Sequence, residues 1–533
     1  MTSTLRILVL LLVVIAAVAV AAKRANIPPA ILLVLTGVVM ALVPGLPPVN
    51  LAPHFVLLFV LPPLVYSSAV AMSWREFRFN LRPISLLAIG CVLFTTTATA
   101  VVAHMLLHFS WSVGFVLGAI VSPPDSVAPL AIARKLQLPR RLLVILEGEG
   151  LANDASALIL YRFAVVAVSA GTFSVTRAAG TFAVILFGEI LWGIATGWLM
   201  LRFRRWVQDA RIEIMLSILT PFLAYWPPQY LGGSGVLATV SAGLYISWNG
   251  LRLISAATRL QGIFFWDFLM YLTEGFVFLI TGLQARSLIA NLHGDSLREL
   301  AASGAVVCGV VIAARFVWMF PATYLPRWLI PSVARNDPAP PWQWPFALAF
   351  TGVRGIVSLA AALAIPLTTE SGALFPDRER TLFLTFSVII VTLVGQGLML
   401  PAVIRALGLA HAGRRERNAD AIEEEEARLE ALEAANWRLG QLAEERRLSQ
   451  AVVRPLRSYL QERREYGDLR RAMEHNEERS IGLRQEIELL LVAAERQSIN
   501  HLYIHGKLKD EARRRIEREL DLREAQLTQL QPE

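Results

Sequence analysis

The chain has 533 residues, of which 55% are hydrophobic and only 17% are charged. Soluble globular proteins carry roughly 25% charged residues, so this composition excludes an ordinary soluble protein and indicates one embedded in a lipid bilayer. The formal net charge of +8 comes from basic residues that flank apolar segments, which argues against a nucleic-acid-binding protein.

Apolar segments recur along the first 405 residues, and each is close to the roughly 20 residues that a helix needs to cross a bilayer. The first is interpreted as a retained helix and not a signal peptide, because it lacks a strongly basic start and a small-residue cleavage site. The sequence therefore predicts an all-α polytopic membrane protein. About thirteen candidate spans, several of them short or interrupted by Gly or Pro, lie at residues 5–22, 27–44, 51–70, 84–107, 111–133, 142–168, 180–201, 213–228, 231–249, 263–285, 300–326, 342–366 and 381–405.

Basic residues gather in every second loop between these spans. The loops on the other side hold far fewer. By the positive-inside rule, the basic loops are cytoplasmic. We therefore expect the protein in the plasma (inner) membrane, with its N-terminus outside and its C-terminal tail in the cytoplasm. The basic loops contain Lys23, Arg24, Arg75, Arg78, Arg82, Arg134, Lys135, Arg140, Arg141, Arg202, Arg204, Arg205, Arg211, Arg252, Arg259, Arg327 and Arg335, against Arg177, Arg286, Arg298, Arg378 and Arg380 on the other side.

The fifth span, "GFVLGAIVSPPDSVAPLAIA", contains a helix-breaking pair of prolines. Pro123 and Pro124 remove two backbone donors and disfavour helix at the residues before them. Unpaired backbone within a membrane is tolerated only where protein or a water-filled cavity satisfies it. Asp125 lies directly on this predicted break, so a carboxylate is expected at an interrupted helix.

The sixth span contains "EGEGLAND", with three acids in eight residues. On a helix, Glu149 and Asn153 lie about 40° apart, whereas Asp154 lies about 140° from Glu149. Glu147 projects near Asp154 but about 10 Å closer to the cytoplasmic end. We therefore expect Asp154 and Glu149 to face different surroundings. Glu147 is either an entry-funnel residue or a charge at the start of the helix.

The twelfth span, "FALAFTGVRGIVSLAAALAIP", is the expected inverted mate of the fifth. Gly352 and Gly355 flank Arg354, and paired interrupted helices in two halves of a chain indicate a transporter site. Arg354 would place a positive charge where helix ends meet. In the eleventh span, Arg315 needs an acid, and Glu149 is the candidate.

Two further acids, Glu189 and Glu274, also lie in apolar segments, and no partner is evident for either from the sequence. Charged groups within spans are functional by default. We interpret these two as cavity-facing structural acids and not as ion ligands.

Asp154 and Asp125 could each be neutralised by a proton or by a small cation, because removal from water disfavours a bare carboxylate. Competition of both species for one site, combined with alternating access, amounts to cation–proton exchange. Oxygen ligands suit a hard ion such as Na⁺ or Li⁺. This chemistry needs no cofactor beyond the transported ions.

From residue 406 to residue 533 the chain becomes highly charged, and it combines helix-forming residues with opposite charges four apart. We predict a cytoplasmic tail of amphipathic helices, broken near Pro455 and Gly506, after a membrane transport domain that spans residues 1–405. Two roles for the tail remain open: a solvated or self-associating element, or a module that binds a regulator.

Three motifs taken in order resemble those of the monovalent cation:proton antiporter family, in its bacterial-type sodium/proton exchanger branch with an extended tail. "SPPDSVAPLAI" resembles the family's (S/T)-x-D-P-V-A break. "EGEGLANDASALILYRFA" resembles E-G-E-S-L-x-N-D-A-x-A-L-V-L-(F/Y)-R-F-A, and "GVRGIVSLAAALAIP" resembles G-x-R-G-x-V-S-L-A-A-A-L-A-I-P. The resemblance covers about residues 5–405.

The resemblance implies that Asp154 and Asp125 bind Na⁺ or a proton, and that Asn153 beside Asp154 goes with electroneutral 1:1 exchange. It also implies a structural bridge from Glu149 to an arginine, with Arg315 as first choice and Arg354 as second. A homodimer is expected, in which a core bundle of about residues 84–168 and 300–405 moves against a dimerisation domain formed by the remainder.

Two residues depart from the family pattern. Gly150 replaces the common Ser, which removes a hydroxyl, and Ser126 replaces Pro after Asp125 and is a candidate substitute oxygen. Ser122 is a further candidate ligand. These departures leave the choice between Na⁺ and K⁺ open.

Rival functions are an intramembrane hydrolase and a channel. "GGSG" at residues 232–235 resembles a nucleophile turn, but no span after it contains a histidine. Paired broken helices also line channels, but a titratable carboxylate site favours stoichiometric exchange. We therefore predict a secondary active transporter and no enzyme, with a monovalent cation, protons and the bilayer as its partners.

Overall fold

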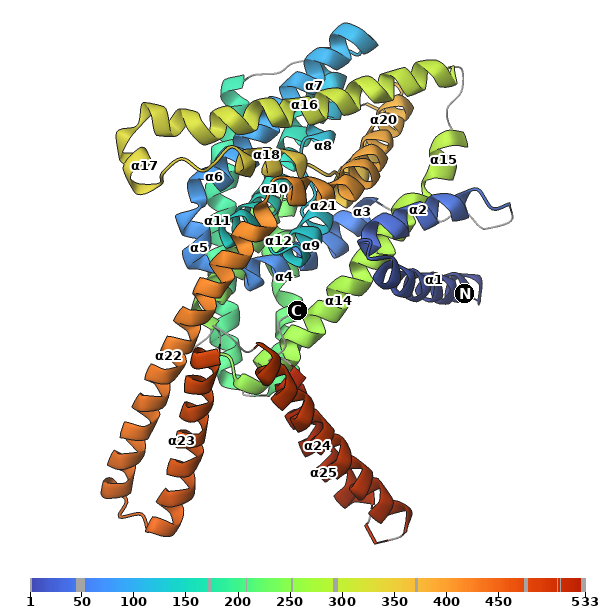
Figure 1. The fold of residues 1–533 in the computed structure, drawn as a ribbon. Coiled ribbons are helices and arrows are strands. Elements are labelled where there is room, and N and C mark those ends of the chain that lie inside the picture. Colours follow the sequence, from blue (N-terminus) through green and yellow to red (C-terminus); the bar gives the residue numbers. More distant parts are fainter. Residues whose placement is uncertain are drawn as a thin grey trace. The chain divides into compact units, whose positions relative to one another are not determined.

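The computed structural model describes residues 2–44, 53–170, 175–207, 209–250, 253–290, 296–369, 372–473, 478–505, 507–508 and 510–528. The chain divides into two compact units, Met1–Arg414 and Arg415–Glu533. Helices make up nearly all of the regular structure (Figure 1). Among the described residues, the β-structure consists of one isolated bridge between Thr368 and Leu374. The predicted all-α fold is confirmed.

The N-terminal half of the first unit consists of α1 (Thr2–Ala25), α2 (Pro29–Ala41), α3 (Pro53–Phe55), η1 (Val56–Val60), α4 (Leu61–Ala71), α5 (Trp74–Phe79), α6 (Leu81–Ser85), η2 (Leu86–Cys91), α7 (Val92–Leu107), α8 (Trp111–Val121), α9 (Val127–Lys135), α10 (Arg140–Ala170) and α11 (Val175–Val207). The remaining helices up to the tail are α12 (Ala210–Tyr230), α13 (Val236–Gly250), α14 (Ala256–Leu283), α15 (Ala285–Ala290), α16 (Leu297–Leu329), α17 (Pro331–Asn336), α18 (Gln343–Phe350), α19 (Ile356–Leu363), α20 (Arg378–Ile390), η3 (Val391–Gln396) and α21 (Gly397–Ala406). The segments η1, η2 and η3 are single π-helical turns that continue directly into their neighbouring helices.

Helical structure occupies every predicted span. Seven of the described helical stretches are long and apolar enough to cross a membrane, and three shorter apolar helices cover the second, third and fifth predicted spans. The eighth and ninth correspond to α12 and α13, of 21 and 15 residues. The twelfth is divided into α18 and α19. Five of these six further spans are short or interrupted helices, and only α12 reaches the length of a full span.

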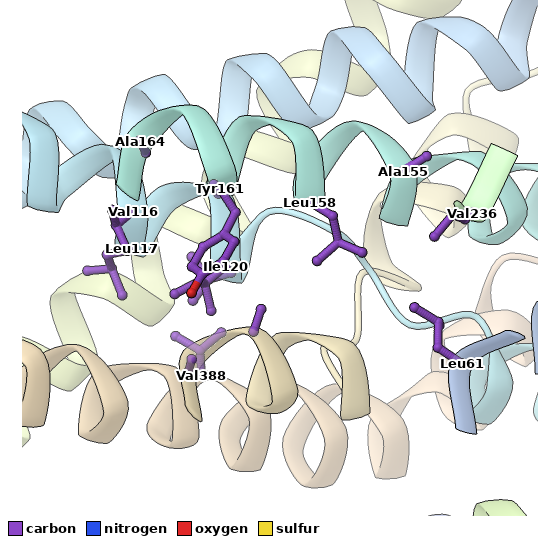
Figure 2. Close-up of a cluster of buried hydrophobic side chains, with 14 of the residues drawn as sticks. Leu61, Val116, Leu117, Ile120, Ala155, Leu158, Tyr161, Ala164, Val236 and Val388 are labelled. Atoms are coloured by element: carbon purple, nitrogen blue, oxygen red, sulfur yellow. The ribbon is translucent and has the colours of Figure 1, made fainter. Parts of the chain in front are cut away.

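The interrupted helix α8 is packed tightly on both sides. A Cβ atom at Gly118 would meet the backbone of Thr96, so α7 and α8 approach each other closely. On another face, Val116, Leu117 and Ile120 lie with Tyr161 of α10 and Val388 of α20 in one buried apolar cluster (Figure 2). This packing fixes the position of α8 beside α7, α10 and α20, and with it the position of the break that follows Val121.

The second unit is a set of long, charged helices. Arg464 pairs with Glu433 at 3.3 Å, and Arg496 pairs with Asp521 at 3.0 Å. Figure 1 shows α22 beside α23 and α24 beside α25. These helices are α22 (Leu409–Glu445), which begins in the first unit, α23 (Gln450–Met473), α24 (Glu478–Ile504) and α25 (Asp510–Thr528).

One predicted break in the tail is wrong and the other is right. Pro455 lies inside α23, where it removes a single backbone hydrogen bond close to the start of the helix. The break lies earlier, between the end of α22 at Glu445 and the start of α23 at Gln450, where Arg447 adopts a left-handed φ of 49°. The break near Gly506 is present between Ile504 and Asp510; Gly506 itself is outside the described residues.

Candidate ion-binding site

The two interrupted helices meet at their breaks. Helix α8 ends at Val121 and α9 begins at Val127, while α18 ends at Phe350 and α19 begins at Ile356. The backbone N–H of Asp125 donates to the carbonyl oxygen of Val353 at 2.6 Å. The structure therefore brings together the two breaks that Pro and Gly mark in the sequence.

Asp125 lies between the N-termini of two half-helices. Its Oδ1 accepts a hydrogen bond from the N–H of Val127 at 2.9 Å, at the start of α9. The N–H of Ile356, at the start of α19, also faces this carboxylate. Gly355 has no room for a Cβ atom, because the Asp125 carboxylate occupies that space. Two helix dipoles thus favour negative charge at Asp125.

Arg354 lies at the opposite, carbonyl ends of the broken helices. Its Nε donates to the carbonyl oxygen of Val121 at 2.9 Å, and its Nη1 donates to the carbonyl oxygen of Gly352. The backbone N–H of Arg354 donates to Oγ1 of Thr392 at 2.9 Å. The fixed positive charge expected where helix ends meet is therefore present, and it compensates the negative ends of α8 and α18.

Asn153 and Asp154, on α10, face the break that holds Asp125. The Asn153 Nδ2 donates to the carbonyl oxygen of Pro124 at 2.7 Å, and its Oδ1 is buried without a hydrogen-bond partner among the described residues. Asp154 is half-buried. Among the residues that the structure describes, none makes a hydrogen bond or ion pair with the Asp154 carboxyl. Only its burial and the nearby negative charge of Asp125 act on this group. Of Asp125 and Asp154, Asp154 is therefore the carboxylate more available to a ligand.

Asp125 and Asp154 both line one cavity of about 1050 Å³. Ser126, Gly150 and Ser358 line it as well. The cavity is far larger than a single ion requires, so water can reach both carboxylates.

Ser126 and Gly150 are direct neighbours. A Cβ atom at Gly150 would collide with Oγ and Cβ of Ser126. The candidate ligand Ser122 lies elsewhere: it is buried, its hydroxyl donates to the carbonyl oxygen of Ala119 at 3.1 Å, and it does not line the cavity. Ser126 therefore has a position suited to a ligand, and Ser122 does not.

Glu149 faces away from the cavity and pairs with Arg315. Arg315 Nη1 and Nη2 donate to the two carboxylate oxygens at 2.5 and 2.8 Å, and both side chains are almost fully buried. Arg315 also donates to the carbonyl oxygen of Leu348 at 3.0 Å, near the end of α18. Arg354, the second-choice partner, is bonded to backbone carbonyls as described above.

Glu147 lies at the mouth of the cavity. It pairs with Arg134 at 2.7 Å, and both residues line the cavity. Because α10 begins at Arg140, Glu147 lies about two turns inside the helix. This position does not fit a charge in the first helical turn, and the entry-funnel role stays a prediction.

Glu189 and Glu274, the two acids for which the sequence shows no partner, lie in different surroundings. Glu189 accepts from the N–H groups of Ser234 at 2.5 Å and of Gly235 at 3.0 Å, and so caps the start of α13; it does not line the cavity. Glu274, on α14, does line the cavity. The cavity-facing expectation therefore holds for Glu274 and is wrong for Glu189.

Two serines, Ser358 and Ser234, lie in surroundings that the sequence alone does not predict. Ser358, in the first turn of α19, lines the cavity, and within the described ranges its buried hydroxyl has no hydrogen-bond partner. It was not predicted as a ligand, although it lies in the motif around Arg354. Ser234, in the turn that resembles a nucleophile, is 1% exposed and donates its hydroxyl to Glu189. Such a hydroxyl is a structural group and is inaccessible to a substrate.

Two interrupted helices that cross at a pair of carboxylates, within a bundle of apolar helices, define a secondary transporter of small cations. The family model "Sodium/hydrogen exchanger, transmembrane" matches residues 8–406, and the chain belongs to this family of cation–proton antiporters.

Relatives with related names span most of the chain. An uncharacterized Na⁺/H⁺ exchanger of Mycobacterium tuberculosis is 34% identical over 529 residues, which cover 98% of this chain and 96% of the relative. A sodium, potassium, lithium and rubidium/H⁺ antiporter of Bacillus subtilis is 33% identical over 359 residues, which cover 65% of this chain and 53% of the relative.

The fold resembles that of a solved antiporter. The sodium proton antiporter MjNhaP1 of Methanocaldococcus jannaschii, at pH 8, matches with a TM-score of 0.61 and 18% identity, over 76% of this chain and 99% of that one. At this level of identity the likeness concerns the fold alone.

Proposed function

We propose that this protein exchanges Na⁺ for H⁺, with both ions competing for Asp154 and Asp125. The observation that carries the proposal is the presence of these two carboxylates on one cavity, at the point where the two broken helices touch. Asp154 has no protein partner in the described part of the chain, whereas Asp125 receives N–H groups from two helix starts. We assign primary ion binding to Asp154 and a supporting role to Asp125.

Asn153 supports a one-for-one stoichiometry. It is neutral, and its amide is held by the Pro124 carbonyl. The ion then meets one bare carboxylate at Asp154, and each cation that binds displaces one proton. No net charge moves in such a cycle, so exchange is electroneutral.

The cavity supports an inward-facing state. It extends from Asp154 to residues of the basic loops, including Arg75 and Arg134. By the positive-inside rule these loops are cytoplasmic in the plasma membrane, and the N-terminus is outside. Glu147, at the same mouth, would attract cations from the cytoplasm.

Alternating access requires that one part of the membrane domain moves against another. One wall of the cavity carries Asp125 and Asp154, from the core bundle of residues 84–168 and 300–405. Tyr66, Trp266 and Glu274 also line the cavity and come from the remainder of the membrane domain. We propose that the remainder forms the interface of a homodimer and that the core bundle moves against it, while the tail associates with itself or with a regulator.

The identity of the cation depends on few oxygen atoms. Ser126 offers a hydroxyl beside Gly150, and Ser358 offers one from α19. K⁺ is the alternative substrate, because a relative whose name includes potassium as well as sodium is 33% identical.

Flux in sealed vesicles tests the proposal. The purified protein is reconstituted, a pH gradient is imposed, and Na⁺, K⁺ or Li⁺ is added while a pH-sensitive dye reports the lumen. We expect Na⁺ to dissipate the gradient. A current carried without proton movement would indicate a channel, and a response to K⁺ alone would replace Na⁺ with K⁺ as the substrate.

A further inference from the structure

Away from the cavity, three arginines from three separate helices converge on one aspartate. Arg141 of α10 and Arg327 of α16 each pair with Asp337 at 2.8 Å, and Arg82 of α6 pairs with the same carboxylate. Three positive charges therefore meet one negative charge. The cluster has an excess of positive charge that Asp337 does not compensate.

Some guanidinium nitrogens of this cluster remain available to a ligand. Arg82 contacts Asp337 through Nη2 only, so its Nε and Nη1 have no hydrogen-bond partner within the described residues. Arg141 uses Nε on Asn80 and Nη1 on Asp337, which leaves Nη2. The side chains of Arg82 and Arg141 are 30% and 24% exposed, so these donors are accessible.

A small hollow of about 40 Å³ lies beside the arginines, with an apolar lining. Arg82, Arg141 and Arg327 line it together with apolar residues, of which Leu86, Ala322 and Trp344 are half-buried. No acid is among the described residues that line the hollow, and Asp337, which pairs with the three arginines, lies outside this lining. Positive donors next to an apolar surface match a molecule that has an anionic head and a hydrocarbon chain.

We propose that this cluster binds the phosphate headgroup of an anionic phospholipid, with an acyl chain against the apolar lining. Arginine matches phosphate through paired N–H donors. Basic pockets between transmembrane helices on the cytoplasmic side are suited to anionic headgroups, and all three arginines belong to the basic side of the protein. A free phosphate ion would use the arginines but would leave the apolar lining without a role.

The test measures lipid binding to the purified full-length chain after delipidation. Native mass spectrometry compares phosphatidylglycerol with phosphatidylcholine of identical acyl chains, for the wild type, Arg82→Gln and Arg405→Gln. Arg82→Gln leaves Asp337 with two arginines. Arg405→Gln is the matched control, because Arg405 is an exposed basic residue at the end of α21. We expect Arg82→Gln to weaken phosphatidylglycerol binding about tenfold, the loss of roughly one charge-assisted hydrogen bond, and Arg405→Gln to leave it unchanged.

Three outcomes would overturn the proposal. They are equal binding of the two lipids by the wild type, equal loss in both variants, and stabilisation of the wild type by inorganic phosphate to the same extent as by the lipid. If Arg82→Gln does not fold, a photoactivatable phosphatidylglycerol on the wild type gives the answer. Crosslinks to residues 82–87, 319–327 or 340–348 support the site, and crosslinks confined to other segments contradict it.

Discussion

The hydroxyl oxygen of Ser126 occupies the space beside Gly150 that a larger side chain at position 150 would need. In the motifs that the chain resembles, the hydroxyl is at position 150 and position 126 is Pro. Here both positions differ, and the two differences compensate: one hydroxyl remains at this place, supplied by the segment after α8 and not by α10.

Gly150→Ser should therefore impair exchange, because its side chain collides with Ser126. Overpacking of this kind costs about 1–3 kcal/mol and displaces the segment that carries Asp125. The double variant Gly150→Ser/Ser126→Ala should recover much of the rate, since a single hydroxyl is restored. Cation-driven proton flux in vesicles measures both. A double variant as impaired as Gly150→Ser would show that the two positions do not compensate.

Asp154→Asn should reduce cation-driven proton flux to that of protein-free vesicles, because the amide cannot exchange a proton for a cation. The variant should still fold, since Asp154 makes no hydrogen bond or ion pair in the described part of the chain. Glu299→Gln is the matched control, as Glu299 is an exposed acid at the start of α16. Flux preserved in a folded Asp154→Asn protein would remove Asp154 from the ion site.

Glu149→Gln should lower the free energy of unfolding. Loss of one partner from a buried ion pair costs about 3–5 kcal/mol, and Arg315 would lose its charged partner while it keeps two hydrogen bonds to the Leu348 carbonyl oxygen. Thermal unfolding in detergent measures the loss. The double variant Glu149→Leu/Arg315→Met should lose less than the sum of the single losses, because no unpaired charge remains. An unchanged unfolding temperature with a shifted cation affinity would place Glu149 in the ion site instead.

Local sequence signals predict the broken helices and the faces of α10. Pro123 and Pro124 remove two consecutive backbone donors and disfavour helix at the residues before them, and helical periodicity alone separates Glu149 from Asp154. The choice of Arg315 as a partner follows from the cost of leaving a buried charge unpaired. These arguments need no knowledge of distant contacts.

Contacts between segments that are distant in the sequence cannot be predicted from local sequence signals. Glu189 caps α13 from a position 45 residues earlier, and no pattern on α11 identifies that helix start. Likewise, Arg82 and Arg141 count only as basic loop residues until the fold brings them to Asp337, 255 and 196 residues away. The contact between Ser126 and Gly150 is of the same kind, because it depends on how closely two segments pack.

Asp337 should make stability depend on pH in the acid range. Burial raises the pKa of its carboxyl, but hydrogen bonds and charges from Arg141 and Arg327 outweigh burial, so the net pKa is below the ordinary value. A folded-state pKa below the unfolded one stabilises the protein above the unfolded value of about 3.9, and this contribution is lost as pH falls through the folded value.

The measurement is the unfolding temperature of wild type and Asp337→Asn in detergent, from about pH 6 down to about pH 3, a range that spans the unfolded pKa. Asp337→Asn should be less stable at pH 6, and the difference should narrow as the wild-type carboxylate becomes protonated. A difference that stays constant over this range would contradict a stabilising charge at Asp337.

Exchange by the wild type should not respond to membrane potential, because Asn153 leaves one bare carboxylate for each transported ion. Asn153→Asp should not convert the protein to electrogenic exchange. Its new carboxylate would face the Pro124 carbonyl, where the Asn153 amide now donates at 2.7 Å, and two acceptors repel each other unless the acid is protonated.

Na⁺-driven proton flux is measured at clamped potentials of both signs. We expect a slower variant with the same lack of voltage dependence. Rates that follow the potential in the wild type would refute one-for-one exchange, and voltage dependence gained only in Asn153→Asp would show that a charge at this position enters the transport cycle.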